Sequence, residues 1–305
     1  MPLFQARKNK LTAVKELQIG LEKDLQLLTE ANLEEVFGLR FIATEFALQN
    51  FRIDTLAYDE ETRSFVIIEY KKDKSFSVID QGFSYLSLLL NNKAEFVLAF
   101  NEKNNKSLSK DDIDWKQSRV LFLAQSFTPY QLNAIGFKDL PIELWEVKKH
   151  ENALILFSQV KPFNKSESIK TISKDTKIQK ISSEVRSYTI EDQFKDGWDV
   201  SRELYNEFWN ELTMLDSRIE ENPRRSGVSF KIGGKVLTYV YIFKSKIRVD
   251  ITRTKPRDLN DPEKRVKYME NSRKFYNQDI SFFEIKASED IGYAIRLLKQ
   301  ALKKY

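Results

Sequence analysis

The first half of the chain alternates between helical and strand-like hydrophobic patterns. Leu21, Leu25 and Leu28 recur at the spacing of one helix face, whereas the run 65–71 alternates as a strand does. The elements predicted for residues 1–160 are a helix at 12–36, strands at 41–48, 51–58 and 64–71, a helix at 77–92, strands at 94–100 and 119–125, a short helix after Pro129, and strands at 142–149 and 153–157. The order helix, three strands, helix, strand predicts a mixed α/β sheet covered by helices.

The second half has a hydrophobic pattern of its own. Its predicted elements are a helix at 201–216, strands at 228–232, 235–243 and 246–253, a helix near 261–275, a strand at 280–285 and a final helix at 289–304. Gly233 and Gly234 fit a two-residue hairpin turn between the first two of these strands. These elements predict a smaller α+β domain.

A stretch without a hydrophobic period separates the two halves. Residues 161–186 hold seven basic and three acidic side chains among serines and threonines. We therefore predict a first domain over 1–160, a charged linker over 161–190 and a basic second domain over 191–305.

The amino-acid composition narrows the chemistry that these domains can carry. The 305 residues include no cysteine and one histidine, His150. Disulfides, thiolate zinc sites and a cysteine nucleophile are excluded, and histidine-based catalysis is nearly excluded. Any reaction must depend on carboxylates, lysines, hydroxyl groups or a metal ion held by oxygen atoms.

Charge is distributed unevenly along the chain. Residues 1–160 carry 20 basic and 23 acidic side chains, whereas residues 161–305 carry 30 and 22. If nucleic acid is a partner, the second half should supply much of the attraction, although a merely soluble basic domain fits the same charge. No run is apolar enough for a membrane span and the first ten residues lack a signal-peptide core. We therefore expect a cytoplasmic protein with no membrane partner.

Two acidic residues and a lysine stand out on neighbouring predicted strands. Alternation places Glu69 and Lys71 on one face of the run 65–71, which is apolar on both faces. Asp54 lies on the preceding strand, and a hairpin connection would bring it beside Glu69. Charges at a buried strand end are costly unless they pair or bind a metal ion. Such oxygen ligands suit Mg²⁺ or Mn²⁺, which keep water molecules for a phosphate substrate.

The spacing Glu-x-Lys is weak by itself, because strand-like runs of this chain contain it three times. The copies begin at Glu69, Glu146 and Glu284. The first copy alone has an aspartate fifteen positions earlier and is followed by a helix with Gln81 and Tyr85 on one face, at i and i+4. A structural ion pair at a strand end and a degenerate, inactive site are the alternatives to a metal-dependent active site.

In this order, the residues resemble the PD-(D/E)XK nuclease superfamily, and the Gln-x-x-x-Tyr element is similar to its RecB-type branch. The resemblance covers roughly residues 12–125. It implies the α/β fold class with a restriction-endonuclease-like αβββαβ core and a mixed sheet, beside the smaller C-terminal α+β domain. Ile53 stands where many members have a proline before the aspartate. The second half resembles an uncharacterised domain sometimes described as a predicted transport protein, through 229–251, 261–265 and the final helix, and no chemistry carries over from it.

The resemblance implies roles for individual side chains. Asp54 and Glu69 match the metal-binding acids, and Lys71 matches the catalytic lysine. Gln81 and Tyr85 match the helix pair that supports the site or contacts the nucleic-acid backbone; a helix border that faces solvent is the plainer interpretation.

Members of the superfamily often carry another acid on the first helix. Glu22 is the candidate here for a third metal ligand, and Glu34 and Glu35 are weaker alternatives. A solvated helix face is an equally good interpretation of Glu22.

Several basic side chains are candidates for contacts with phosphate groups. They are Arg52, Lys72, Arg224 and Arg225. A local salt bridge for Arg52, and a solvated loop for Arg224 and Arg225, are the alternatives.

The function that follows from these interpretations is a Mg²⁺- or Mn²⁺-dependent nuclease that hydrolyses phosphodiester bonds in DNA, with RNA not excluded as substrate. The alternative is a catalytically inactive, nuclease-like module that binds nucleic acid or protein. A third hypothesis is a structural or oligomerisation role in which the second domain pairs subunits, and a homodimer is compatible with all three.

Overall fold

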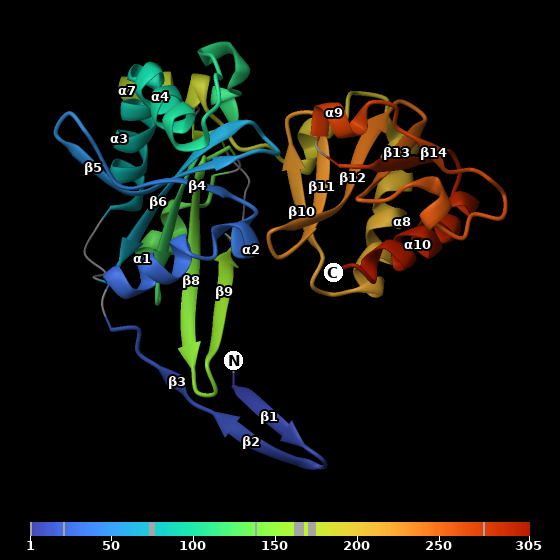
Figure 1. Ribbon diagram of the computed structural model, residues 1–305, viewed down its shortest axis with the longest axis horizontal. Coiled ribbons are helices and arrows are strands. Elements are labelled where there is room, and N and C mark those ends of the chain that lie inside the picture. The colour runs from blue at the N-terminus through green and yellow to red at the C-terminus, as the bar shows by residue number, and fades with distance from the viewer. Residues whose placement is uncertain are drawn as a thin grey trace. The chain divides into compact units, whose positions relative to one another are not determined.

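The computed structural model describes residues 2–20, 22–72, 77–137, 139–161, 168–169, 175–276 and 278–305. The chain divides into two compact units, Met1–Ser187 and Tyr188–Tyr305, and Figure 1 labels most of their helices and strands. Among the described residues, no helix is long and apolar enough to cross a membrane.

The first unit is built on a mixed sheet. Its strands are β1 (Leu3–Arg7), β2 (Lys10–Val14), β3 (Glu16–Leu17), β4 (Arg40–Leu48), β5 (Phe51–Asp59), β6 (Ser64–Lys71), β7 (Arg119–Ala124), β8 (Ile142–His150) and β9 (Leu154–Val160). Apart from the separate β1–β2 hairpin, the strand order is β3-β8-β7-β6-β5-β4, and β9 pairs with β8. The pairs β4–β5 and β5–β6 are antiparallel, whereas β6–β7 and β7–β8 are parallel. The predicted mixed α/β sheet is confirmed, and the narrower αβββαβ core stays a prediction.

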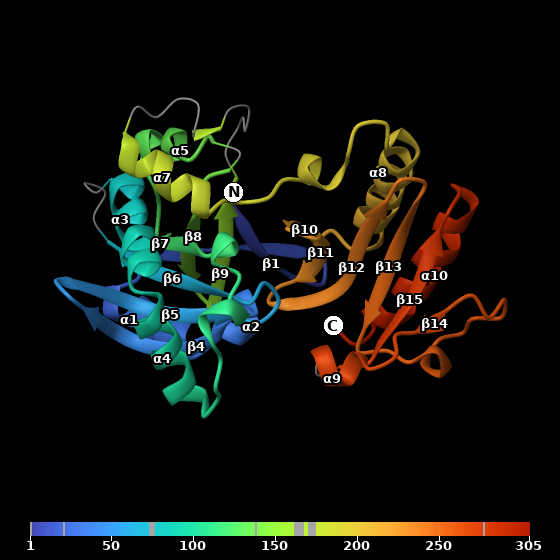
Figure 2. The same ribbon diagram turned by 90° about the horizontal axis from the view of Figure 1, so that it is seen from above.

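Helices cover both faces of this sheet. They are α1 (Glu22–Glu30), α2 (Leu33–Phe37), α3 (Val78–Asn91), α4 (Lys93–Asn104), α5 (Pro129–Ala134) and α7 (Thr176–Glu184), with the short 3-10 turns η1 (Lys110–Asp112) and η2 (Trp115–Gln117). One core joins α3 and α4 to the face that carries Leu56, Ile67 and Phe122. A second core joins α1 and α2 to the opposite face, and Figure 2 shows the sheet between these two layers.

Strand β6 is the central strand of the first unit. All of its residues except Lys71 are buried, as the apolar run on both faces predicts. Its pairing with β5 extends from Asp59 opposite Ser64 to Thr55 opposite Ile68. The ladder stops one position before Asp54 and Glu69, so both acids lie where the two strands cease to pair.

Two predictions for the first unit are wrong. The run 94–100, predicted as a strand, belongs to helix α4. Its buried residues Phe96, Val97 and Phe100 recur at helical spacing while Leu98 is exposed. The single helix predicted over 12–36 is two helices, α1 and α2, separated by a turn at Ala31 and Asn32, and residues before them form β2 and β3. Leu21 lies outside the described residues.

The predicted linker over 161–190 is not a linker throughout. Its described residues 176–184 form α7, and Ile181 and Val185 are buried in the first unit's core. The boundary between the two units therefore follows Ser187. The buried isoleucine and valine stand among lysines and serines, which conceals their pattern in the sequence.

The second unit is an antiparallel sheet with helices packed on it. Its elements are η3 (Ile190–Gln193), α8 (Asp199–Leu215), β10 (Glu220–Arg224), β11 (Gly227–Ile232), β12 (Lys235–Phe243), β13 (Lys246–Thr252), η4 (Pro256–Asp258), β14 (Lys267–Tyr268), α9 (Ser272–Tyr276), β15 (Ile280–Ile285) and α10 (Glu289–Leu302). The strand order is β10-β11-β12-β13-β15-β14. Helices α8 and α10 bury Phe208 and Leu298 in its core. The prediction of a helix near 261–275 is wrong. Much of that segment is irregular, and α9 covers only its end.

Candidate active site at the ends of β5 and β6

Asp54, Glu69 and Lys71 meet where β5 and β6 stop pairing. The Oδ2 atom of Asp54 accepts a hydrogen bond of 3.0 Å from the backbone N–H of Tyr70. Lys71 donates through Nζ to Oε1 of Glu69 over 2.9 Å. A hairpin ladder would have used the Tyr70 N–H for a backbone bond, so the end of pairing makes this donor available to the Asp54 carboxylate.

Glu69 is the most deeply placed charged group of the site. Its side chain is in the core layer under α3, and the residue is only 4% exposed. Oε1 accepts from both Lys71 and Gln81, the latter over 3.0 Å. Oε2 is buried and has no hydrogen-bond partner among the described residues. A buried carboxylate oxygen without a partner is energetically costly, which is typical of an atom that binds something else.

Gln81 and Tyr85 connect Glu69 to the backbone of β5. Gln81 donates through Nε2 to the Tyr85 hydroxyl over 3.2 Å, and that hydroxyl donates to the backbone oxygen of Arg52 over 3.4 Å. Tyr85 is buried rather than facing solvent. In this geometry Gln81 and Tyr85 join Glu69 to the backbone of β5, and both expected roles, support of the site and contact with nucleic acid, stay predictions.

The electrostatics of the site disfavour two ionised carboxylates. Burial raises the pKa of Asp54 from its ordinary value of 3.8 to about 6, and the nearby negative charge of Glu69 adds to this effect. The Tyr70 N–H and the Lys71 ammonium act in the opposite direction without cancelling the shift. A carboxylate pair of this kind is stabilised by a cation between or beside its members.

Helix α1 contacts the same strand ends from the other face of the sheet. Glu22, its first residue, accepts the backbone N–H of Lys72 through Oε1. Gln26 is buried and donates through Nε2 to the backbone oxygen of Asp54 over 2.8 Å. Gln26 was missed by the sequence analysis, although an amide on the buried face of a helix is a signal that could have found it.

The donor set fits a hard divalent cation that keeps most of its water. Among the described residues, no three His, Cys, Asp or Glu side chains are placed to hold a metal ion together. The structure therefore does not gather Glu22 with Asp54 and Glu69 as a third ligand, and the alternatives Glu34 and Glu35 lie on exposed positions of α2. Two carboxylates with several waters remain an ordinary arrangement for Mg²⁺.

Arg52 and Lys72 flank this site without entering it. Arg52 is exposed and forms an ion pair with Glu45, the local salt bridge considered above. Lys72 is exposed beyond the end of β6. Glu45 has a left-handed backbone (φ 51°), and its charge also raises the pKa of Asp54. No feature of the sequence marks Glu45 for this position.

Arg224 and Arg225 belong to the second unit. Arg224 ends strand β10, not a loop, and its backbone oxygen accepts a hydrogen bond of 2.6 Å from Gln193. Arg225 lies in the turn before β11. Their contact with phosphate stays a prediction.

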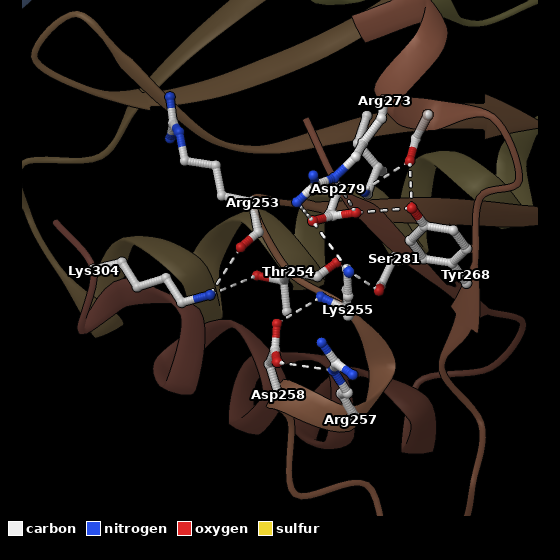
Figure 3. Close-up of polar contacts among 12 residues, drawn as sticks. Arg253, Thr254, Lys255, Arg257, Asp258, Tyr268, Arg273, Asp279, Ser281 and Lys304 are labelled. Atoms are coloured by element: carbon white, nitrogen blue, oxygen red, sulfur yellow. Dashed lines mark hydrogen bonds and ion pairs between the residues drawn. The ribbon is translucent and has the colours of Figure 1, made fainter. Parts of the chain in front are cut away.

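A second basic group in this unit surrounds the end of β13. Figure 3 shows five cations around residues 253–258, namely Arg253, Lys255, Arg257, Arg273 and Lys304, together with the acids Asp258 and Asp279. Arg273 donates to both Asp279 oxygens over 2.9 and 2.7 Å, and Lys304 donates to the Arg253 backbone oxygen over 2.8 Å. Arg257 is 80% exposed at its side chain. The cations outnumber the acids, so this surface, here named the β13-end cluster, is positively charged.

Comparison with known proteins yields one relative that spans the chain. An uncharacterized protein of Haemophilus influenzae is 37% identical over 304 residues, which cover 99% of this chain and 100% of that protein. No protein-family model matches the sequence, so the resemblance of the second half to the predicted transport domain receives no support.

Solved structures give weaker similarities. A repair endonuclease from Pyrococcus abyssi is 18% identical over 43% of this chain and 49% of its own, with a TM-score of 0.23. EndoMS in a complex with double-stranded DNA is 15% identical over 48% and 64% (TM-score 0.24), and Pyrococcus furiosus SfsA in complex with Ca²⁺ is 12% identical over 49% and 75% (TM-score 0.24). TM-scores this low do not establish a shared fold.

Proposed function

We propose that this chain, which belongs to the family of the uncharacterized Haemophilus influenzae protein, is a Mg²⁺- or Mn²⁺-dependent nuclease that hydrolyses phosphodiester bonds in DNA. The observation that carries the proposal is the unpartnered, buried Oε2 atom of Glu69 beside Asp54 and Lys71. Oδ2 of Asp59, another such atom in the described part of the chain, pairs with Arg119 over 3.0 Å. The proposal is therefore supported by the combination of this Glu69 atom with Asp54 and Lys71 at neighbouring strand ends.

The carboxylates of Asp54 and Glu69 would hold the metal ion. Tyr70 fixes one Asp54 oxygen through its backbone N–H, and Gln81 and Lys71 fix one Glu69 oxygen, so one oxygen of Glu69 is left for the cation. When bound, the cation stabilises the negative charge of the reacting phosphate and makes a water molecule more acidic.

Lys71 acts at the mouth of the site. Its ammonium is bonded to Glu69 over 2.9 Å, yet a fifth of its side chain remains exposed. From this position it can orient an attacking water molecule or stabilise charge on the phosphate. Gln81 and Tyr85 hold the Glu69 carboxylate in place and do not take part in the bond exchange.

The second unit would supply attraction to the DNA backbone. The β13-end cluster places five cations beside two acids, and the turn at Arg225 adds further positive charge. Contacts between lysine or arginine and phosphate are largely independent of sequence, so this unit would strengthen binding without selecting bases.

Cleavage of supercoiled plasmid and single-stranded DNA with Mg²⁺ or Mn²⁺ tests the proposal. The full chain should cut at least one of these substrates, whereas Asp54→Ala and Lys71→Ala should each lower the rate by about 10²–10⁴-fold. Lys286→Ala, which removes the lysine of another Glu-x-Lys copy, is the matched control and should retain the rate of the unaltered chain.

Two outcomes would contradict the nuclease proposal. Equal cleavage by all four proteins would assign the activity to a contaminant or to another site. Absence of cleavage, together with salt-dependent DNA binding and no Mn²⁺ binding in calorimetry, would identify the chain as the inactive binding module.

A further inference from the structure

The hairpin of β1 and β2 is part of the first unit's chain but of none of its cores. Nine of its ten strand residues are exposed, and only Val14 is buried. Figure 1 shows the hairpin beyond the turn that joins β8 to β9, with no helix drawn over it. A two-stranded hairpin alone in water is marginally stable at best, so this one requires a partner surface.

One face of the hairpin is entirely apolar. In the antiparallel register Phe4 lies opposite Ala13, and Ala6 lies opposite Leu11, which places these four side chains on the same face. Phe4 is 48% exposed and Leu11 is 67% exposed. The chain that carries this face therefore does not cover it.

Exposed apolar side chains are concentrated near this hairpin. The described part of the chain has sixteen exposed large hydrophobic residues, and seven of them lie on four strands that meet at this end of the first unit. These seven are Leu3, Phe4, Leu11, Leu17, Leu154, Ile155 and Leu156. The last three belong to β9, which pairs with β8 and has no second partner strand among the described residues. Exposed apolar side chains beside an open sheet edge are typical of a surface that another protein covers.

The charges of the chain indicate which protein that is. The hairpin and its connection, residues 2–17, carry four basic side chains and one acidic side chain. Helices α1 and α2, residues 22–37, carry five acidic side chains and one basic side chain. The same helices expose Leu27 and Leu28. An apolar, cationic hairpin and an apolar, anionic helix surface are complementary, and one chain carries both.

We propose that this protein forms a two-fold homodimer in which the β1–β2 hairpin of each copy packs on the α1–α2 surface of the other. A two-fold axis makes the contact twice, so each copy both gives a hairpin and receives one. The hairpin of the same copy is held elsewhere, because Glu16 pairs with His150 and Lys15 bonds to Glu151 at the β8–β9 turn. DNA would pair with the hairpin's cations but would leave Phe4 and Leu11 in water.

Light scattering and sedimentation velocity on the full chain test the dimer. The unaltered protein should have twice the 35.9 kDa mass of one chain, and a double variant, Phe4→Glu with Leu11→Glu, should be monomeric. Because neither residue is in a core, the variant should still fold, with a thermal unfolding midpoint that no longer depends on protein concentration. It should also retain the DNA cleavage rate of the unaltered protein. Leu98→Glu, at a 56% exposed leucine of α4, is the matched control and should remain dimeric.

A charge-reversal pair tests the partner surface independently of folding. Glu34→Lys should weaken the dimer at least tenfold, and Arg7→Glu with Lys10→Glu in the same chain should restore much of the affinity. A monomeric unaltered protein, or a double variant that stays dimeric, would overturn the proposal. A variant that loses DNA binding while its mass is unchanged would assign the hairpin to nucleic acid instead.

Discussion

The end of β6 and the end of β15 carry the same Glu-x-Lys spacing in opposite physical settings. Glu284 accepts from Lys246, and Lys286 lies 3.3 Å from its Oε2 atom, so both oxygens face a cation. These hydrogen bonds hold the pKa of Glu284 below its ordinary value of 4.5. Glu69 instead accepts from a lysine and an amide through one oxygen, its other oxygen has no hydrogen bond from the described residues, and its neighbour Asp54 has a raised pKa.

The surroundings of the glutamate, and not the Glu-x-Lys spacing, therefore distinguish a structural ion pair from a candidate site. At β15 two flexible lysines neutralise one half-exposed acid, which is an ordinary surface arrangement. At β6 two acids share one lysine in a buried place. A buried excess of negative charge of this kind is costly in the unliganded protein and is a recognised mark of functional sites.

The largest difference is expected when the charge is removed from Glu69 and, in a separate variant, from Glu284. Glu69→Gln should lower Mn²⁺ affinity in calorimetry by about 10–100-fold or more, because it removes one of two carboxylates from the site. Glu284→Gln should leave Mn²⁺ affinity unchanged. Equal losses in both variants would erase the distinction between the two copies.

A smaller loss is expected when the support of Glu69 is weakened. Tyr85→Phe removes the hydroxyl that joins Gln81 to the Arg52 backbone, and Mn²⁺ affinity and cleavage rate should each fall by about 10-fold. Tyr293→Phe removes a hydroxyl that donates to Asp261 in the second unit, and should change neither quantity. Normal metal affinity in Tyr85→Phe would mean that Glu69 does not need this support.

Neutralising Asp54 and neutralising Glu284 should change the free energy of unfolding in opposite directions. In metal-free buffer at pH 7 the ionised Asp54 destabilises the folded state, because its folded pKa is about 6 against an ordinary 3.8. Asp54→Asn should therefore raise the unfolding free energy by about 1–2 kcal/mol after allowance for solvent screening. The stability that the protonated acid contributes is complete below pH 3.8 and is lost as the pH rises through 6, so the gain should disappear near pH 4.

Glu284→Gln should instead destabilise the protein at pH 7 by about 0.2–1 kcal/mol, because an exposed ion pair is lost. The lowered pKa of Glu284 means that its contribution is present above pH 4.5 and is lost as the pH falls through the folded value. Denaturant melts at several pH values measure both variants. A destabilised Asp54→Asn would show that the buried acid is structural.

The smallest expected effect concerns the β13-end cluster. Arg257→Ser should weaken DNA binding only slightly and lower the slope of log affinity against log salt by about one, because one phosphate contact is lost. Arg218→Ser, in a loop of the same unit where the arginine pairs with Asp216, should leave the slope unchanged. Titrations at three salt concentrations suffice. An unchanged slope for Arg257→Ser would move the DNA contact elsewhere.

Patterns of two-residue and helical period predicted the elements around the site well. The three strands that carry or flank Asp54 and Glu69 lie within one residue of their predicted ends, and helix α3 is where the apolar face of 77–92 indicated. These segments have long, unambiguous patterns. The run 94–100 has only seven residues, six of them apolar, and its helical burial was decided by the core beneath it.

Other parts of the site depend on contacts that no local pattern contains. Gln26 reaches the Asp54 backbone from a helix twenty-eight positions earlier, and the charge of Glu45 on β4 adds to the raised pKa of Asp54. Helix α7 is likewise recognisable only from the core into which Ile181 packs. Spacing identified the acids and the lysine, whereas burial and strand divergence define their electrostatics.

The position of β6 between one antiparallel and one parallel neighbour bears on how the chain is made. The β5–β6 turn spans only residues 60–63, whereas the pairing of Glu69 with Phe122 closes a loop of about fifty residues. The β5–β6 hairpin that carries both acids can therefore form before β7 pairs with β6. We expect the repulsion between Asp54 and Glu69 to grow when β7 and α3 complete the sheet and remove water from around the two carboxylates.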